Sequence, residues 1–297
     1  MPIPSNRLRD IEQYFYAQLA DLYADGELRS MWRLLVEGFL DWTTVQYLLH
    51  RDEPINQSDL LRFYWAVEDL KRRKPIQYII GYTQFAGCRI EVNHHVLIPR
   101  PETEEIVEQI TVACHDLGRV MDLCTGSGCI AIALAKRYEG AEVWGIDVDD
   151  QALQVAQRNA EENEVEVRWM QADLLQHTAK LPEGEFDLVV SNPPYITPSE
   201  REAMEDNVLL YEPELALFVP NEDPLLFYRV IANRCRSLLS QRGILVFEIN
   251  ELYGKQTLEM LSELNYRAEL REDFRGRPRS VWAQYQSGKW GRRRITP

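Results

Sequence analysis

The chain has 297 residues, 45% of them hydrophobic, and its formal net charge is −14. This length suits one large domain and one small one, and the negative charge disfavours broad binding to a phosphate backbone. No apolar run approaches the roughly 18 residues that a membrane-spanning helix needs, so we expect a cytoplasmic protein with no membrane contact.

Residues 1–75 are predicted to form a small helical bundle. Their apolar residues recur three and four positions apart, which is the spacing of one helical face. Thr43 or Thr44 is expected to open one short helix, and Ser58 to cap the last one, which ends in the basic run 71–74. The bundle contains no recognisable cofactor motif.

Residues 76–97 are interpreted as a β-hairpin linker. Two short runs, 77–80 and 89–92, have strand-like composition and lie around Gly81 and Gly87.

The segment 98–105 follows the linker. Its Pro101 suits the first turn of a helix, where the helix dipole favours the acidic residues that come next. Arg100 and Glu102 are interpreted either as cap chemistry or as residues near a cofactor.

Residues 98–287 are predicted to form an α/β domain. From residue 119 strands and helices alternate, with strands at 119–123, 142–146 and 166–170 and helices at 130–136 and 151–163. Such alternation builds an open, Rossmann-like parallel sheet with helices on both faces.

A glycine loop, Cys124-Thr125-Gly126-Ser127-Gly128, lies between the first of these strands and its helix. Glycines there let a ligand approach the backbone closely. A dinucleotide fingerprint would need a third glycine, and Ala131 stands in its place. Asp122, just before the loop, suits a ligand with a sulfonium or ammonium better than one with phosphates.

Two further acidic residues end the following strands. Asp147 is placed to accept hydrogen bonds from ribose hydroxyls, and Asp173, next to Leu174, from an adenine amino group. Because the carboxyl ends of parallel strands meet at one edge, Asp122, Asp147 and Asp173 are expected to converge. S-adenosylmethionine is the ligand that fits them best.

The sequence Asn192-Pro193-Pro194-Tyr195 follows a predicted buried strand at 186–190. Two prolines without amide hydrogens end the strand abruptly. The Asn192 side-chain oxygen and the Pro193 carbonyl are placed to accept the two hydrogens of an amino group, and Tyr195 to stack on a flat group. The alternative is an ordinary turn at a strand end.

The cysteines and histidines predict no metal site. Five cysteines without a CxxC pair argue against a zinc cluster and against a disulfide framework. His94 and His95 are expected on a strand, pointing to opposite faces, and are interpreted as structural.

Together these motifs resemble the class I methyltransferases that modify planar amino groups. Three further features narrow the resemblance to the HemK/PrmC family of release factor glutamine N5-methyltransferases, over the chain to about residue 286. They are the N-terminal helical region, the segment Ile98-Pro99-Arg100-Pro101-Glu102-Thr103-Glu104, and Tyr211-Glu212-Pro213 with Leu215-Ala216-Leu217.

The resemblance implies a substrate and a set of site residues. The substrate is the glutamine of the Gly-Gly-Gln motif in peptide chain release factors, whose side-chain amide receives the methyl group, with residues 1–75 recognising the protein substrate. Asn192, Pro193 and Tyr195 are the implied catalytic residues. With Pro194 they hold the glutamine, while residues 124–128, Asp147, Leu174 and Asn192 contact the cofactor.

Alternatives stay open at this point. Cys124 stands where the family often has glycine, and the loop also resembles enzymes that methylate a glutamine of a large-subunit ribosomal protein. A DNA or RNA amino-methyltransferase uses the same Asn-Pro-Pro-Tyr chemistry on a flipped base. A non-catalytic translation-factor binding protein is a further alternative. We expect a monomer without direct nucleic-acid contact and a basic tail at 288–297.

Overall fold

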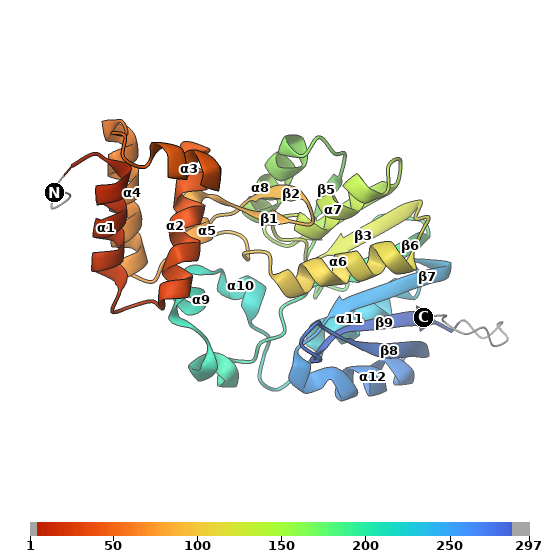
Figure 1. The fold of residues 1–297 in the computed structure, drawn as a ribbon. Coiled ribbons are helices and arrows are strands. Elements are labelled where there is room, and N and C mark those ends of the chain that lie inside the picture. Colours follow the sequence, from red (N-terminus) through yellow and green to blue (C-terminus); the bar gives the residue numbers. More distant parts are fainter. Residues whose placement is uncertain (1–4, 287–297) are drawn as a thin grey trace. The chain divides into compact units, whose positions relative to one another are not determined.

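The computed structural model describes residues 5–286, which form two compact units. One unit contains the chain up to Tyr82 together with Glu205–Tyr211, and the other contains Thr83–Met204 and the chain from Glu212 onward (Figure 1). The expected continuous domain at 98–287 is therefore interrupted by one segment that packs with the helical unit. The predicted basic tail at 288–297 lies outside the described residues.

The first unit consists of helices. Apolar residues on one face of each long helix form its core, in which Phe15, Trp32 and Phe63 pack together. The Tyr211 hydroxyl donates to the Arg72 carbonyl at 2.9 Å and ties in the later segment. The helices are α1 (Leu8–Leu19), α2 (Asp25–Leu40), α3 (Thr44–His50), α4 (Gln57–Lys71), α5 (Ile76–Ile80) and α9 (Asp206–Tyr211).

Caps fix two of these helix starts. Thr43 caps α3 in a reciprocal arrangement with Gln46, as the sequence predicts. The predicted cap of α4 is wrong, because Asn56 and not Ser58 precedes the first turn and its side chain accepts from the Asp59 amide at 2.8 Å. Asparagine and serine cap equally well, so the sequence pattern does not decide between them.

The hairpin is shorter than predicted. Residues 77–80 are not a strand: they belong to α5, which follows Pro75 and ends at Gly81 with φ 89°. Five residues are too few for a helical period to be distinguished from a strand period. The hairpin itself pairs β1 (Tyr82–Phe85) with β2 (Cys88–Glu91) through a turn in which both central residues have positive φ.

A seven-stranded sheet organises the second unit, and the predicted α/β fold class is confirmed. The strand order is β5-β4-β3-β6-β7-β9-β8. The first five strands pair in parallel, and β9 pairs antiparallel with both β7 and β8, so β9 alone runs in the opposite direction. The strands are β3 (Arg119–Leu123), β4 (Glu142–Asp147), β5 (Arg168–Gln171), β6 (Phe186–Ser191), β7 (Leu239–Glu248), β8 (Tyr266–Glu272) and β9 (Pro278–Tyr285).

Helices cover this sheet. Helices α6 (Pro101–Ala113), α7 (Cys129–Arg137) and α8 (Asp150–Glu162) contact one another in turn, while α11 (Leu226–Cys235) and α12 (Gly254–Glu263) pack on β7, β8 and β9 (Figure 1). Shorter elements are α10 (Glu214–Leu217) and 3₁₀ turns at Pro198–Ala203 and Glu251–Tyr253. Within residues 5–286 no helix is both long and apolar enough to cross a bilayer.

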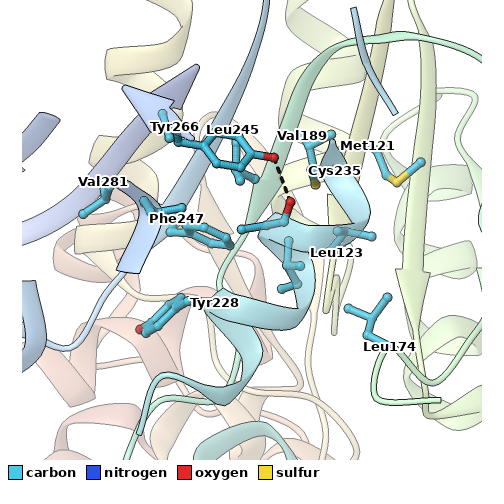
Figure 2. Packing of buried hydrophobic residues seen from close by; sticks show 14 of the residues in the cluster. Met121, Leu123, Leu174, Val189, Tyr228, Cys235, Leu245, Phe247, Tyr266 and Val281 are labelled. Carbon is cyan, nitrogen blue, oxygen red and sulfur yellow. Dashed lines mark hydrogen bonds between the residues drawn. The ribbon is translucent and has the colours of Figure 1, made fainter. Parts of the chain in front are cut away.

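The core beneath α11 is apolar and includes a hydrogen bond from Tyr266 to the helix backbone. Leu245, Phe247 and Val281 of the sheet pack under the helix, and the Tyr266 hydroxyl donates to the Ala232 carbonyl at 2.7 Å (Figure 2). Because this core packs behind β6 and β7, the carboxyl ends of both strands are held rigidly at the edge of the sheet.

Two asparagines one helical turn apart fasten the hairpin to α8. Asn159 Oδ1 accepts from the Glu91 amide at 2.6 Å, and Asn163 Oδ1 accepts from the Arg89 amide at 3.1 Å. Each side-chain nitrogen donates back to the carbonyl of the same β2 residue. The edge of β2 is thereby paired by side chains, as another strand would pair it.

Candidate active site

A cavity of about 230 Å³ opens at the carboxyl edge of the sheet, within the second unit. It collects residues from β3, β4, β5 and β6 together with the segments before α6 and around α10. The predicted site residues that line it are Cys124, Thr125, Gly126, Ser127, Asp147, Asp173, Leu174, Asn192 and Pro194.

The glycine loop turns sharply between β3 and α7. Cys124, Gly126 and Gly128 have φ values of 60°, 53° and 79°, so three of its five residues adopt the left-handed conformation. A Cβ on Gly126 would meet nothing within 4 Å, whereas one on Gly128 would lie 2.8 Å from the Trp169 ring. Gly126 therefore faces open space, and Gly128 permits close packing of the loop.

Asp122 lies behind the loop and not in the cavity wall. Its Oδ2 accepts from the Thr125 hydroxyl at 2.5 Å and from the Ala131 amide at 3.3 Å. Its Oδ1 is buried and has no hydrogen-bond partner among the described residues. Burial raises the pKa of Asp122 to about 7. The side chain thus shapes the loop from inside.

Asp147 presents its carboxylate to the cavity. Oδ2 accepts from the Gly126 amide at 2.8 Å and Oδ1 from the Asp149 amide at 3.0 Å, which leaves each oxygen able to accept again. Burial raises the pKa of Asp147, and these two amides act in the opposite direction. Two hydroxyls of a ribose match such a pair of acceptors.

Asp173 and Leu174 form the wall beyond β5. Asp173 Oδ1 accepts from the Leu175 amide at 2.9 Å, and Oδ2 accepts from the Gln176 side chain at 3.1 Å, so the carboxylate also shapes the turn after the strand. Leu174 is buried and supplies an apolar surface. The wall combines one acceptor with one apolar face, as a heteroaromatic ring requires.

The Asn192 motif leaves β6 where the prolines end it. Asn192 Nδ2 donates to the Thr103 hydroxyl oxygen at 3.3 Å, so its Oδ1 points elsewhere, and no described residue donates to Oδ1. No described residue donates to the Pro193 carbonyl either. Two unsatisfied acceptors therefore follow one another on the chain.

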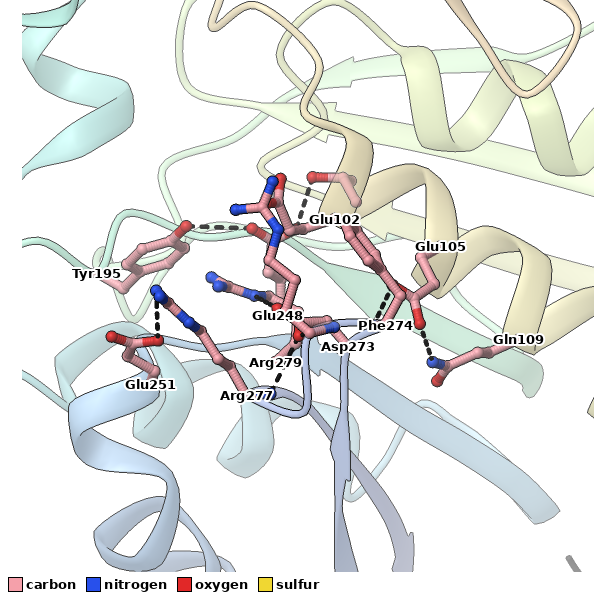
Figure 3. Close-up of polar contacts among 12 residues, drawn as sticks. Glu102, Glu105, Gln109, Tyr195, Glu248, Glu251, Asp273, Phe274, Arg277 and Arg279 are labelled. Carbon is pink, nitrogen blue, oxygen red and sulfur yellow. Dashed lines mark hydrogen bonds and ion pairs between the residues drawn. The ribbon is translucent and has the colours of Figure 1, made fainter.

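Tyr195 is placed differently from the prediction. Its hydroxyl donates to Glu248 Oε1 at 3.1 Å (Figure 3). The ring packs against the core of the second unit. Among the described residues, Pro193 and Tyr195 are not part of the cavity lining.

Sequence reasoning missed two hydrogen-bonded side chains beside the motif. Thr103 lies in the first turn of α6, and Glu248 ends β7; both are 2% exposed. The Thr103 hydroxyl donates to Glu248 Oε2 at 2.6 Å. A glutamate at the end of an otherwise apolar strand is the sequence signal that points to a buried polar role.

Arg100 precedes α6 without a side-chain cap hydrogen bond, and it lines the cavity. Its guanidinium lies 2.5 Å from Glu212 Oε1, and Glu212 Oε2 accepts from the Ile98 amide at 3.2 Å. Burial raises the pKa of Glu212, and Arg100 opposes that shift. The pair joins the segment before α6 to the one before α10.

The prediction that His94 and His95 point to opposite faces of a strand is wrong. Both lie in a turn after β2, and their ring centroids are 3.9 Å apart. Within the described chain no cluster of His, Cys, Asp and Glu has the arrangement of a metal site. The turn forms because β2 already ends at Glu91.

Comparison with known proteins places this chain in a family. Residues 10–81 match the PrmC N-terminal domain, and residues 102–210 match the methyltransferase small domain. A release factor glutamine methyltransferase of Flavobacterium psychrophilum is 41% identical over 94% of this chain and 99% of its own length. The chain belongs to the release factor glutamine methyltransferase family.

Other relatives agree with this assignment. The release factor glutamine methyltransferase of Bacteroides thetaiotaomicron is 38% identical over 92% of this chain and 98% of its own length. A crystal structure of a methyltransferase from Pyrococcus furiosus has a TM-score of 0.50 at 18% identity and covers 66% of this chain and 88% of its own. That similarity concerns the fold alone.

The release factor glutamine methyltransferase family uses S-adenosylmethionine as its methyl donor, and the residues of the cavity fit that molecule. Asp147 offers acceptors to ribose hydroxyls, Asp173 and Leu174 suit an adenine ring, and Gly126 leaves open space beside the loop. When bound, the cofactor supplies a methyl group on a cationic sulfur. When it is ionised, the buried carboxyl group of Asp122 behind the loop favours positive charge on that side.

Proposed function

We propose that this protein methylates the side-chain amide nitrogen of the glutamine in the Gly-Gly-Gln motif of peptide chain release factors. The observation that carries the proposal is the orientation of Asn192, whose Nδ2 is engaged by Thr103 while Oδ1 is left to accept. A glutamine amide brings two N–H donors and therefore needs two acceptors. Asn192 Oδ1 and the Pro193 carbonyl are two acceptors of the required kind.

These acceptors address the difficulty of the reaction. An amide nitrogen is a poor nucleophile because its lone pair is delocalised into the carbonyl group. Two fixed acceptors orient the nitrogen and favour the positive charge that develops on it as the new N–C bond forms. The methylated amide is strongly acidic, so its extra proton passes to water without a side-chain base.

Mass spectrometry of unmethylated release factor tests the proposal. After incubation with the protein and S-adenosylmethionine, we expect a gain of one methyl group on the Gly-Gly-Gln glutamine and none on a Gly-Gly-Ala variant. A large-subunit ribosomal protein and duplex DNA serve as parallel substrates. Methyl transfer to either of these, and none to the release factor, would overturn the proposed substrate.

The helical unit is proposed to grip the release factor. It exposes large apolar side chains at Val45, Leu48 and Leu49 of the single short helix α3, and Leu49 is 72% exposed. Apolar residues exposed in a group are typical of protein-binding surfaces. The protein is further proposed to act as a cytoplasmic monomer without direct contact to nucleic acid, which its net charge of −14 supports.

Leu49→Glu tests the role of the helical unit. We expect a higher KM for whole release factor and unchanged kinetics on a short Gly-Gly-Gln peptide. Val112→Glu, at an equally exposed position on α6 of the other unit, is the matched control. Equal effects of Leu49→Glu on protein and peptide would contradict a gripping role.

A further inference from the structure

A buried carboxylate ends the strand beside the Asn192 motif. β6 and β7 run parallel with Ser191 opposite Phe247. Asn192, just past the end of β6, and Glu248, the last residue of β7, are the next residues along the two chains. Glu248 is buried outside the cavity lining, where an ionised carboxylate is costly to keep. The carboxylate oxygens of Glu248 accept hydrogen bonds from two hydroxyl groups.

Each oxygen of Glu248 accepts one hydroxyl. Thr103 Oγ1 of α6 donates to Oε2 at 2.6 Å. The Tyr195 hydroxyl of the motif donates to Oε1 at 3.1 Å (Figure 3). Arg279 supplies positive charge nearby and is itself held by Asp273 Oδ2, 3.3 Å from its Nε. The positive charge of Arg279 thus stabilises the carboxylate, and the carboxylate fixes the direction of the Thr103 and Tyr195 hydroxyl protons.

The direction of this chain of hydrogen bonds determines how Asn192 lies. A threonine hydroxyl has one proton, and Thr103 gives that proton to Glu248, so its oxygen can only accept from Asn192. Asn192 satisfies it with Nδ2 at 3.3 Å. If the hydroxyl proton had no carboxylate to bind, it would be free to bind Asn192 Oδ1, and the opposite orientation of the amide would become favourable.

We propose that Glu248 is a positioning residue that acts through Thr103 to keep Asn192 Oδ1 turned toward the substrate amide. Its contact to Tyr195 holds the other end of the same four-residue motif. The inference rests on the proposed function, because the Asn192 oxygen matters only for a substrate that brings N–H donors.

Substitutions at both ends of the contact test the inference. Glu248→Met removes both acceptors at similar side-chain length, and Thr103→Val removes the hydroxyl at similar volume. We expect each to lower kcat on release factor by about tenfold or more, with the dissociation constant of S-adenosylmethionine unchanged within about twofold. Since both act through one hydrogen bond, the double variant should be no slower than the slower single variant.

A binding measurement distinguishes a turned Asn192 amide from a general loss of structure at the site. Asn192 Oδ1 and the Pro193 carbonyl should repel a glutamate in the Gly-Gly-Gln position, so wild-type protein should bind a Gly-Gly-Glu release factor weakly by calorimetry. In Glu248→Met the turned amide presents Nδ2, and the preference for glutamine over glutamate should fall by about fivefold or more. A residue with only a structural role would weaken both ligands equally.

Controls make the outcome decisive. Thr103→Ser keeps the hydroxyl and should retain kcat, as should Glu251→Gln, which alters a partly exposed carboxylate paired with Arg277 at 3.6 Å. If Glu248→Met does not fold, the comparison of Thr103→Val with Thr103→Ser still tests the inference. Normal kcat in Thr103→Val, or additive losses in the double variant, would overturn it. Wild-type protein that fails to methylate release factor would instead overturn the proposed function.

Discussion

Asn159 of α8 donates through Nδ2 to the carbonyl of Ser127 in the glycine loop, at 2.9 Å. The same side chain pairs with both backbone groups of Glu91 in the hairpin. Asn159 is 1% exposed, and its contact to Ser127 is buried. One buried amide therefore joins the cofactor loop, α8 and β2.

Asn159→Ala is expected to destabilise the protein and to weaken cofactor binding. It leaves the buried Ser127 carbonyl without this donor, at about 1–3 kcal/mol for a buried group without a partner, and it removes the two contacts to the partly buried Glu91 backbone. Asn163→Ala, one turn later and partly exposed, is the matched control and should cost less. Thermal unfolding with and without S-adenosylmethionine measures both effects. Equal losses of stability and of cofactor binding in the two variants would show that the contact to Ser127 contributes to neither.

Asn192→Ala is expected to remove most of kcat while changing cofactor affinity only modestly. The substitution deletes the acceptor that orients the substrate nitrogen, and losing one such contact typically lowers kcat by about 100-fold. Asn233→Ala, exposed on α11, is the control for loss of an asparagine away from the cavity. Single-turnover methylation of release factor measures the rate. Near-normal turnover of Asn192→Ala would remove the central element of the mechanism.

The pKa of Asp122, raised by burial to about 7, predicts a pH dependence of stability. The folded state binds this proton more tightly than the unfolded state, whose pKa is near 3.8. Its contribution to the free energy of unfolding is therefore full below about pH 4 and declines as pH rises to about 7.

Asp122→Asn removes this titration while keeping an oxygen for Thr125. Between pH 4 and 7 the stability of the variant relative to wild type should rise, by on the order of 4 kcal/mol at most. Denaturant unfolding of both proteins at several pH values measures the difference in their free energies of unfolding. Other titrating groups, such as Glu212 and Glu248, contribute to both proteins and cancel in this difference. A difference independent of pH would contradict the assignment.

Cys124 stands in the left-handed conformation, with φ 60°. A side chain there costs about 1 kcal/mol or more, which glycine avoids. Cys124→Gly should therefore keep cofactor binding and stability near wild type despite the lost thiol packing. Cys124→Val should lower the melting temperature, because a branched Cβ suits positive φ poorly. Equal melting temperatures of the two variants would show that this backbone strain is negligible.

Local patterns predict the glycine loop and the strands β3, β4, β5 and β6, whereas β7, β8 and β9 were not predicted. The apolar pattern predicts the strand at 119–123, and the chemistry of Pro101 predicts the helix that begins there. Alternating strands and helices impose a parallel sheet, and its carboxyl edge then brings Asp147 and Asn192 to one cavity. Such features depend on neighbours in sequence, which is why they could be predicted.

Contacts between distant segments could not be predicted in this way. Thr103 and Glu248 are 145 residues apart, and only the completed sheet brings the end of β7 to the first turn of α6. The aromatic ring of Tyr195 suggests stacking on a flat substrate group. In the structure its hydroxyl donates to the buried carboxylate of Glu248. The helix at 76–80 was mistaken for a strand because its apolar residues fit both periods.

The helical unit is assembled from two stretches of chain, one ending at Tyr82 and the other Glu205–Tyr211. A hybrid that exchanges this unit between relatives therefore needs three junctions instead of one, because α9 must travel with the helices it packs against. Relatives whose helical units differ in sequence should therefore also differ in the sequence of α9. Variation in the family is thus expected to link two regions that lie more than a hundred residues apart in the chain.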